Sequence, residues 1–322
     1  MEIKDIRGIY TSVLKNVQKV IVGKEEVFTL LFTTILSGGH ILLEDNPGTG
    51  KTTLAKCIAQ SVDGTFKRVQ FTPDLMPQDI TGLNIYNQKD GDFHLMKGPV
   101  FTNIFLADEI NRATPRTQSA LLEAMEEKTV TIDGETMKVP EPFLVIATEN
   151  PIETSGTYPL PEAQLDRFMM KLTMGSLDHD QETGILARFM KDDPLKELGK
   201  CCTVEDILKA RETVKCVKVK KEVMDYIVDI SEATRHSSKI IVGVSPRASL
   251  LLMRAAMSFA AISGRNYVTP DDVKYLAPHV FAHRILTASG LGRMDETRKI
   301  ISDLTKTITA PVEDWSDKKN KE

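Results

Sequence analysis

The stretch from Gly39 to Ala55 constrains the fold of this chain more than any other part of the sequence. It reads Gly-His-Ile-Leu-Leu-Glu-Asp-Asn-Pro-Gly-Thr-Gly-Lys-Thr-Thr-Leu-Ala. The short apolar run 41–43 is bounded by turn residues and predicts a buried strand. The Asn-Pro pair and the two glycines predict a loop, and the sequence reads as a helix from Lys51. A strand, a glycine-bearing loop and a helix N-terminus together predict a cradle for phosphate groups.

The residues of this cradle have roles that a nucleoside triphosphate would require. Lys51 would reach the β- and γ-phosphates, and the Thr52 hydroxyl would ligate Mg²⁺. The full pattern G-x-x-x-x-G-K-[ST] has a glycine where this chain has Asp45, a residue that tolerates left-handed backbone angles. Because a carboxylate repels phosphate, we expect Asp45 to point away from the nucleotide. The predicted nucleotide contacts are Asn46, Pro47, Gly48, Thr49, Gly50, Lys51, Thr52 and Thr53.

Composition limits the class of protein. The 322 residues are enough for about two domains, and 41% hydrophobic with 27% charged residues is ordinary for a globular protein. The net charge of −4 gives no global basic field for nucleic acid or anionic membrane. The four cysteines lack the spacing of a zinc site, which favours reduced thiols. Without an apolar run of membrane-spanning length or an N-terminal signal core, we expect a soluble, cytoplasmic protein.

Strand and helix patterns alternate up to about residue 175, which predicts an α/β fold with a parallel sheet flanked by helices. Besides 41–43, the runs 103–107 and 143–147 read as buried strands, and 66–71 alternates like a strand. Two hairpins are expected, at 83–93 and at 129–139. Residues 1–35 read as two helices interrupted at Val20–Gly23. Val22 and Gly23 lie just upstream of the phosphate loop, where they could line an adenine pocket.

Strand signals stop after about residue 175, and the rest of the chain predicts a smaller, all-helical domain. The predicted helices are 203–214, 220–236, 246–263 and 270–285. Thr203 and Asp206 form a capping pattern, and Thr269 is an N-cap followed by proline at the first helical position. We therefore divide the chain into a nucleotide-binding domain, 1–174, and a helical lid domain, 175–322.

Polar residues at the ends of the next two strands supply further parts of a phosphoryl-transfer site. Asp108 ends an apolar strand at the edge where α/β sheets bind ligands, so we expect it to hold Mg²⁺ together with Thr52. Glu109 is the candidate to polarise the attacking water. Asn150 ends the following strand and could orient that water or touch the γ-phosphate, although Asn before Pro is often only turn chemistry.

Two arginines are candidates to compensate charge in the transition state. Arg247 lies in the first turn of a helix, where a cation opposes the helix dipole at about 0.3–1 kcal/mol, which suggests an anionic target such as the nucleotide. Arg167 is the candidate arginine finger, with a surface ion pair to Asp166 or Glu162 as the alternative. A finger serving a neighbouring subunit implies a ring and typically contributes about 10³–10⁵-fold in rate.

Further motifs give the chain a resemblance, over roughly residues 15–290, to the MoxR branch of the AAA+ ATPases. They are Gln70-Phe71-Thr72-Pro73-Asp74, Asp79-Ile80-Thr81-Gly82, Asp108-Glu109-Ile110-Asn111-Arg112-Ala113, Gln118 to Met125, Ala147 to Pro151, and Leu160 to Phe168. By this resemblance, Lys51 and Thr52 look like Walker A, Asp108 and Glu109 like Walker B, Asn150 like sensor 1, Arg167 like the arginine finger and Arg247 like sensor 2.

The resemblance also carries expectations about assembly and activity. It implies a P-loop AAA+ fold, ATP and Mg²⁺ as cofactors, and a hexameric ring. It implies a chaperone-like role in maturing protein complexes, with von Willebrand A domain proteins as partners besides the protein client. The two hairpins look like the helix-2 and pre-sensor insertions of this clade.

Three functions are compatible with these motifs, and the motifs favour an ATP-driven protein remodeller. The first alternative is a nucleic-acid motor, because related ring ATPases with the same insertions translocate DNA. The hairpin tips carry only Lys89 and Lys138 as cations, each beside acids, which argues against nucleic acid as a partner. The second alternative is a nucleotide-gated scaffold with negligible turnover. The presence of Glu109, Asn150 and Arg167 argues against it.

Overall fold

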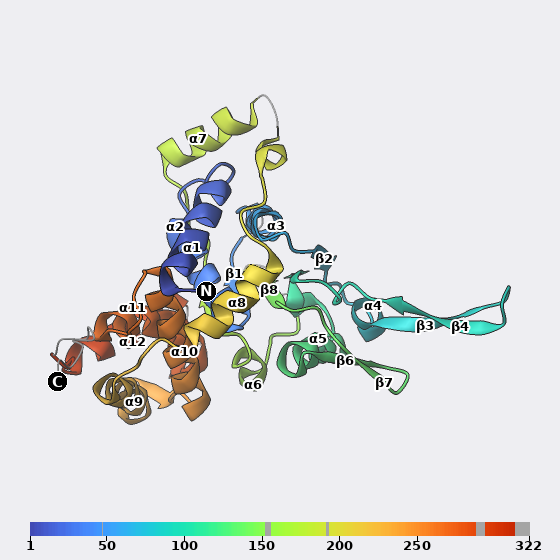
Figure 1. The fold of residues 1–322 in the computed structure, drawn as a ribbon. Coiled ribbons are helices and arrows are strands. Elements are labelled where there is room, and N and C mark those ends of the chain that lie inside the picture. Colours follow the sequence, from blue (N-terminus) through green and yellow to red (C-terminus); the bar gives the residue numbers. More distant parts are fainter. Residues whose placement is uncertain (47, 152–155, 191–192, 288–293, 313–322) are drawn as a thin grey trace, which may run out of the picture.

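The computed structural model describes residues 1–46, 48–151, 156–190, 193–287 and 294–312. Its centre is a parallel five-stranded sheet with the order β2-β5-β8-β1-β9 (Figure 1). The strands are β1 (Ile41–Glu44), β2 (Phe66–Gln70), β5 (Ile104–Asp108), β8 (Leu144–Glu149) and β9 (Met170–Leu172). Strands β1, β5 and β8 were predicted from their apolar runs and β2 from its alternating pattern, and the parallel α/β sheet is confirmed.

Helices cover both faces of the sheet, so alternate residues of its central strands enter two different hydrophobic cores. Leu106 packs in the core formed with α1, α2 and α3, whereas its neighbour Phe105 packs in the core formed with α5. The helices up to residue 175 are α1 (Ile3–Val17), α2 (Glu25–Ser37), α3 (Lys51–Ser61), α4 (Pro77–Thr81), α5 (Pro115–Glu127) and α6 (Glu162–Leu165), with a 3₁₀ turn η1 (Ile110–Arg112). Burial on both faces explains why the central strands read as continuous apolar runs.

Both predicted hairpins are present. They are formed by β3 (Gly82–Asn87) with β4 (Asp92–Lys97), and by β6 (Thr129–Ile132) with β7 (Glu135–Lys138). The first is longer than expected, since its second strand continues to Lys97, and it projects away from the body of the molecule (Figure 1).

The second half of the chain is helical, as predicted, apart from one short ribbon. Its helices are α7 (His179–Phe189), α8 (Val204–Val214), α9 (Lys221–His236), α10 (Pro246–Ile262), α11 (Pro270–Phe281) and α12 (Met294–Thr307), with 3₁₀ turns η2 (Pro194–Glu197) and η3 (Ala282–Arg284). The expectation of an all-helical domain missed the antiparallel pair β10 (Ile240–Val242) and β11 (Leu286–Thr287). Strands of two and three residues are too short to show an alternating pattern.

Helix ends in this half follow the predicted capping chemistry. The Thr203 and Thr269 side chains each accept a hydrogen bond from the third helical N–H, and Asp206 and Asp272 complete the two capping boxes. The predicted domain boundary between residues 174 and 175 stays a prediction. Helix α2 of the first domain packs against α8 and α10 of the second, and the three helices share one hydrophobic core. No helix among the described residues is both long and apolar enough to cross a membrane.

Buried His40 makes the stability of the fold depend on pH. Its Nε2 lies 3.1 Å from the carbonyl oxygen of Met125, and its Nδ1 accepts from the N–H of Val145 at 3.0 Å, so the ring serves as donor and acceptor only when neutral. Burial lowers the pKa of His40 to about 4. The unfolded chain therefore binds the extra proton between about pH 6.5 and pH 4, and stability is lost as the pH falls through this window.

We expect the urea midpoint of unfolding to fall between pH 7 and pH 4.5, and to fall less steeply in His40→Met. That variant should be less stable at pH 7, since it loses two buried hydrogen bonds, yet retain more of its own stability at low pH. His236→Gln, at an exposed position, serves as the control and should keep the wild-type pH dependence. If the urea midpoint of His40→Met fell with pH as steeply as that of the wild type, His40 would not be a source of the pH dependence.

Candidate active site

The predicted phosphate loop lies between β1 and α3, at the carboxyl edge of the sheet. Gly48 and Gly50 have φ of 83° and 90°, values that favour glycine, and α3 begins at Lys51 without a side-chain cap. Its first N–H groups are therefore available to an anion. A cavity of about 330 Å³ opens here, lined by residues 48–53 together with Asp45, Arg68, Gln70, Asp108, Glu109 and Asn150. Of the predicted contacts, Asn46 does not line it and Pro47 lies outside the described residues.

The Asp45 carboxylate, which we expect to point away from the phosphates, accepts hydrogen bonds from backbone N–H groups. One oxygen accepts from Met174 N–H at 2.7 Å and the other from Asn46 N–H at 2.9 Å. The Lys51 ammonium donates to the Asp45 carbonyl oxygen at 2.8 Å, and burial lowers the pKa of Lys51. Aspartate thus replaces glycine in the loop while its carboxylate is occupied by backbone donors.

Asp108 is the last residue of β5, and both of its carboxylate oxygens have partners. Oδ1 accepts from the Thr148 hydroxyl at 2.7 Å. Oδ2 accepts from the guanidinium of Arg68, at 2.6 Å from Nη2 and 3.0 Å from Nε. Asp108 and Thr52 both line the cavity and offer the oxygen donors that Mg²⁺ prefers, with phosphate and water oxygens to complete the shell. These two residues fit the predicted metal site.

Glu109 follows at a sharp turn of the backbone. Its φ of 56° and ψ of 53° are left-handed, and its N–H donates to the Thr148 hydroxyl at 2.8 Å. Its carboxylate accepts from Gln70 at 2.8 Å and from Arg112 at 2.9 Å. Asn150, at the end of β8, is 6% exposed and lines the same cavity. The structure therefore brings together Lys51, Thr52, Asp108, Glu109 and Asn150 as predicted.

Arg167 and Arg247 lie next to each other, but neither lines this cavity. Both bind Glu126 near the end of α5: Arg167 Nε lies 3.0 Å from one oxygen, and Arg247 Nη1 lies 3.0 Å from the other. Arg247 also lies 3.6 Å from Asp166. These two carboxylates hold the Arg247 guanidinium in the structure, and its expected contact with a nucleotide stays a prediction. Arg167 binds Glu126, whereas the surface ion pair that was the alternative to an arginine finger involved Asp166 or Glu162.

The segment predicted to line an adenine pocket lies against α7. A Cβ on Gly23 would meet the side chain of Gln181 at 2.5 Å, and Val22 approaches Gly184. The buried ammonium of Lys24 donates to the carbonyls of Gly175 and Ser176, both at 2.9 Å. Neither Val22 nor Gly23 lines the phosphate cavity. Their contact with a base stays a prediction.

Sequence reasoning missed the residues that hold the two carboxylates, namely Arg68, Gln70, Arg112 and Thr148. Arg68 and Gln70 alternate along β2, whose Gln70 is in register with Asp108. Two polar residues that lie two positions apart at the end of a strand share one face. This pattern is the sequence signal that could have identified Arg68 and Gln70.

The guanidinium of Arg68 binds Oδ2 of Asp108 in the cavity, so it would compete with a metal ion for this carboxylate. We expect Arg68→Ala to lower the Mg²⁺ concentration needed for half-maximal nucleotide binding by about fivefold, the equivalent of ~1 kcal/mol for a partly exposed ion pair. Titration with a fluorescent ATP analogue at a series of Mg²⁺ concentrations measures this. Lys67→Ala, at the adjacent exposed position, is the control and should behave as wild type. An unchanged or higher Mg²⁺ requirement in Arg68→Ala would show that Arg68 does not compete with Mg²⁺ for Asp108.

Comparison with known proteins gives consistent matches over most of the chain. Residues 40–170 match the family model "ATPase family associated with various cellular activities (AAA)", and residues 232–304 match "AAA lid domain". Chaperone MoxR1 of Mycobacterium tuberculosis is 41% identical over 306 residues, covering 92% of this chain and 81% of that protein. The uncharacterised protein YeaC of Bacillus subtilis is 43% identical over 311 residues, covering 96% and 97%.

A solved structure agrees with these sequence matches. The crystal structure of a candidate ATPase from Cytophaga hutchinsonii superposes with a TM-score of 0.88 at 39% identity, covering 96% of this chain and 97% of that one. A likeness of this extent includes the sheet, the phosphate loop and the helical second half.

Proposed function

This chain belongs to the MoxR family of AAA+ ATPases, and from that premise we propose that it couples Mg²⁺-dependent ATP hydrolysis to the remodelling of protein complexes. The observation that carries the proposal is the convergence of Lys51, Thr52, Asp108, Glu109 and Asn150 on one cavity at the carboxyl edge of the sheet. A phosphate cradle, two metal ligands, a base and a water-positioning amide are the parts that phosphoryl transfer requires.

Each residue has a separate task in this mechanism. The N–H groups at the start of α3 and the Lys51 ammonium bind the phosphates, while Thr52 and Asp108 would hold Mg²⁺. The metal ion, when bound, supplies neutralisation of charge on the phosphate oxygens. Glu109 accepts a proton from the attacking water, and the Asn150 amide orients that water.

We further propose that Arg167 and Arg247 act on the nucleotide of a neighbouring subunit in a hexameric ring. Both arginines lie outside their own chain's cavity and are held together by Glu126. Arg167 precedes β9, so it lies beyond the amino edge of the sheet, whereas the cavity lies at the carboxyl edge. A residue placed at the opposite edge serves catalysis only when a second subunit brings its cavity there.

The proposed substrates are protein complexes, with von Willebrand A domain proteins as partners. The name of the relative Chaperone MoxR1 supports a chaperone-like role. The β3–β4 hairpin carries exposed Tyr86 and Phe93, while its only basic tip residue, Lys89, adjoins Asp90, so a protein partner is favoured over nucleic acid. A cytoplasmic location is part of the proposal and is supported by the four cysteines, all of which are unpaired.

Co-purification with an ATP-trapping variant tests this function. Glu109→Gln loaded with ATP and Mg²⁺ is expected to retain a von Willebrand A domain protein and a client complex. Lys51→Ala, which lacks the phosphate-binding ammonium, is the matched control and should release both. Equal retention by the two variants, or retention that ADP supports as well as ATP, would count against ATP-driven remodelling.

A further inference from the structure

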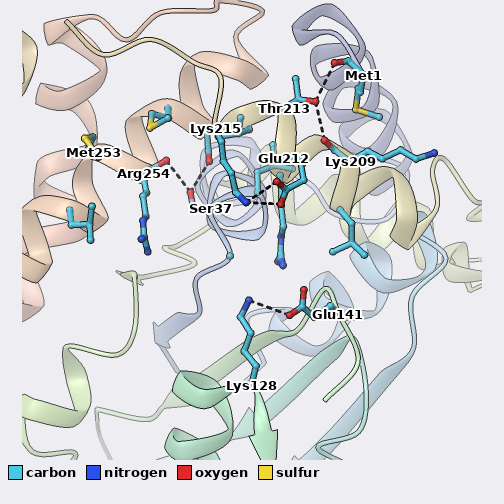
Figure 2. A pocket seen from close by; sticks show the side chains of 18 residues that line it. Met1, Ser37, Lys128, Glu141, Lys209, Glu212, Thr213, Lys215, Met253 and Arg254 are labelled. Atoms are coloured by element: carbon cyan, nitrogen blue, oxygen red, sulfur yellow. Dashed lines mark hydrogen bonds and ion pairs between the residues drawn. The ribbon is translucent and has the colours of Figure 1, made fainter. Parts of the chain in front are cut away.

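A second and larger cavity, of about 990 Å³, lies near the amino edge of the sheet, away from the phosphate loop (Figure 2). Its walls are the ends of α2 and α8, one face of α10, and residues Lys128 and Glu141. The α10 face presents Leu250, Met253 and Met257 at helical spacing. Leu250 is 42% exposed, so this apolar stripe is open to a partner.

The charge around this cavity is predominantly positive. Five cations line it, Lys128, Lys209, Arg211, Lys215 and Arg254, against two acids, Glu141 and Glu212. Each acid already has a lysine partner, Lys128 at 3.4 Å and Lys215 at 2.7 Å respectively. Among the described residues, Lys209 and Arg254 have no ion-pair partner, and Arg211 Nη2 has no hydrogen-bond partner. In Figure 2 the side chains of Arg254 and Lys128 enter the space from opposite walls.

Helix α7 presents a surface with the complementary character. Its inner face holds Gln181 and Gly184 against the segment at Val22 and Gly23. Its outer face carries Glu182, followed at helical spacing by Leu186, Phe189 and Met190, which are 73%, 46% and 74% exposed. None of the eleven residues of α7 is buried. A helix this short is marginal in water unless its apolar face is packed.

We propose that the outer face of α7 docks into the amino-edge cavity of a second copy of this chain. Leu186, Phe189 and Met190 would pack on the apolar stripe of α10, and the acid Glu182, on the same face of α7, would lie among the unpaired cations. The inference rests on the proposed ring and specifies the contact that builds it. Because α7 and the cavity are different surfaces, the contact is heterologous and generates a ring if it closes.

The positions of the two surfaces agree with catalysis between subunits. α7 packs against Gly23, in the segment that we expect to contact the base, whereas the cavity borders Lys128, two residues beyond the Glu126 that holds Arg167 and Arg247. Figure 1 shows α7 at one end of the molecule and α6 with α10 toward the other. The docking therefore places the two arginines of one copy toward the nucleotide side of the next.

Exchanging charge between two variants of the full chain tests the contact. The first variant carries Glu182→Lys on the outer face of α7, and the second carries Lys209→Glu and Arg254→Glu in the cavity. All three positions are exposed. With Mg²⁺ and a non-hydrolysable ATP analogue, light scattering should show wild-type assembly but only small species for each variant alone. The equimolar mixture should regain the wild-type mass, because alternating subunits pair opposite charges at every contact.

Matched measurements separate the failure of this contact from the failure of the ring. Glu232→Lys, an exposed change on α9, should keep the wild-type mass. Rescue by mixing shows that each variant is folded. If each charge variant assembles alone, or the mixture fails to assemble while wild type does, the contact is overturned and the ring stands. If wild type itself never assembles, both are overturned.

A disulfide trap gives a second readout. In a background with Cys216→Ser, proteins carrying Leu186→Cys and Leu250→Cys are mixed, assembled and oxidised. A disulfide-linked pair is expected in the mixture and not in either protein alone. Absence of the linked pair under conditions of full assembly would overturn the docking of α7 on α10.

Discussion

Replacing Glu109 by glutamine is expected to lower ATP turnover by about 10²–10³-fold while ATP affinity stays near the wild-type value. We assign the Glu109 carboxylate as the group that accepts a proton from water, whereas the N–H groups at the start of α3 and the Lys51 ammonium bind the phosphates. Glutamine keeps an acceptor oxygen for Gln70 and Arg112, which hold this side chain at 2.8 and 2.9 Å, so the loop should keep its conformation. The change therefore removes basicity and little else.

Phosphate release under saturating ATP and Mg²⁺ measures turnover, and a fluorescent ATP analogue measures affinity. Glu135→Gln, the same substitution on the exposed β6–β7 hairpin, is the control and should turn over as wild type. Turnover by Glu109→Gln within a few-fold of wild type would remove Glu109 from the mechanism. A large loss of affinity would instead show that Glu109 supports the phosphate loop.

Sequence patterns within short segments predicted the elements of this fold that depend on neighbouring residues alone. The phosphate loop, four of the five sheet strands and both hairpins follow from apolar runs and turn residues. Strand β9 was missed, because its three residues have Lys171 at the centre. That lysine is only 9% exposed and is held by Glu44 at 2.8 Å and Glu149 at 3.2 Å, so a charge occupies a buried strand position.

The candidate site was predictable where each residue ends or follows a strand at the same edge. Lys51 begins the helix after β1, and Asp108 and Asn150 lie at the ends of β5 and β8. These residues had to meet, because parallel strands place their carboxyl ends together. The partners of Arg247 could not be predicted, since Glu126 is remote in sequence and meets it only through the packing of the second half on α5. The capture of Asp108 by Arg68 likewise depends on the register of β2 and β5.

Replacing Arg167 by alanine is expected to reduce ATP hydrolysis by about 10³-fold or more, while sparing ATP affinity, because an arginine finger acts on the transition state. Arg167 lies outside its own chain's phosphate cavity, so the loss must arise in a neighbouring subunit. Glu126 keeps Arg247 as a partner at 3.0 Å in this variant, so the substitution leaves no isolated carboxylate. Arg7→Ala, at an exposed position on α1, is the control and should hydrolyse ATP as wild type does.

Mixing Arg167→Ala with Lys51→Ala protein then decides whether sites are shared. Lys51→Ala lacks a working cradle but contributes an intact Arg167, whereas Arg167→Ala contributes an intact cradle. If subunits exchange at random in an equimolar heterologous ring, about a quarter of the interfaces combine both intact parts. Phosphate release should therefore rise well above that of either variant alone and reach a maximum near equal proportions. Light scattering shows whether the mixture assembles. If it assembles and its rate of phosphate release equals the sum of the rates of the two variants at every ratio, each chain hydrolyses ATP with its own residues.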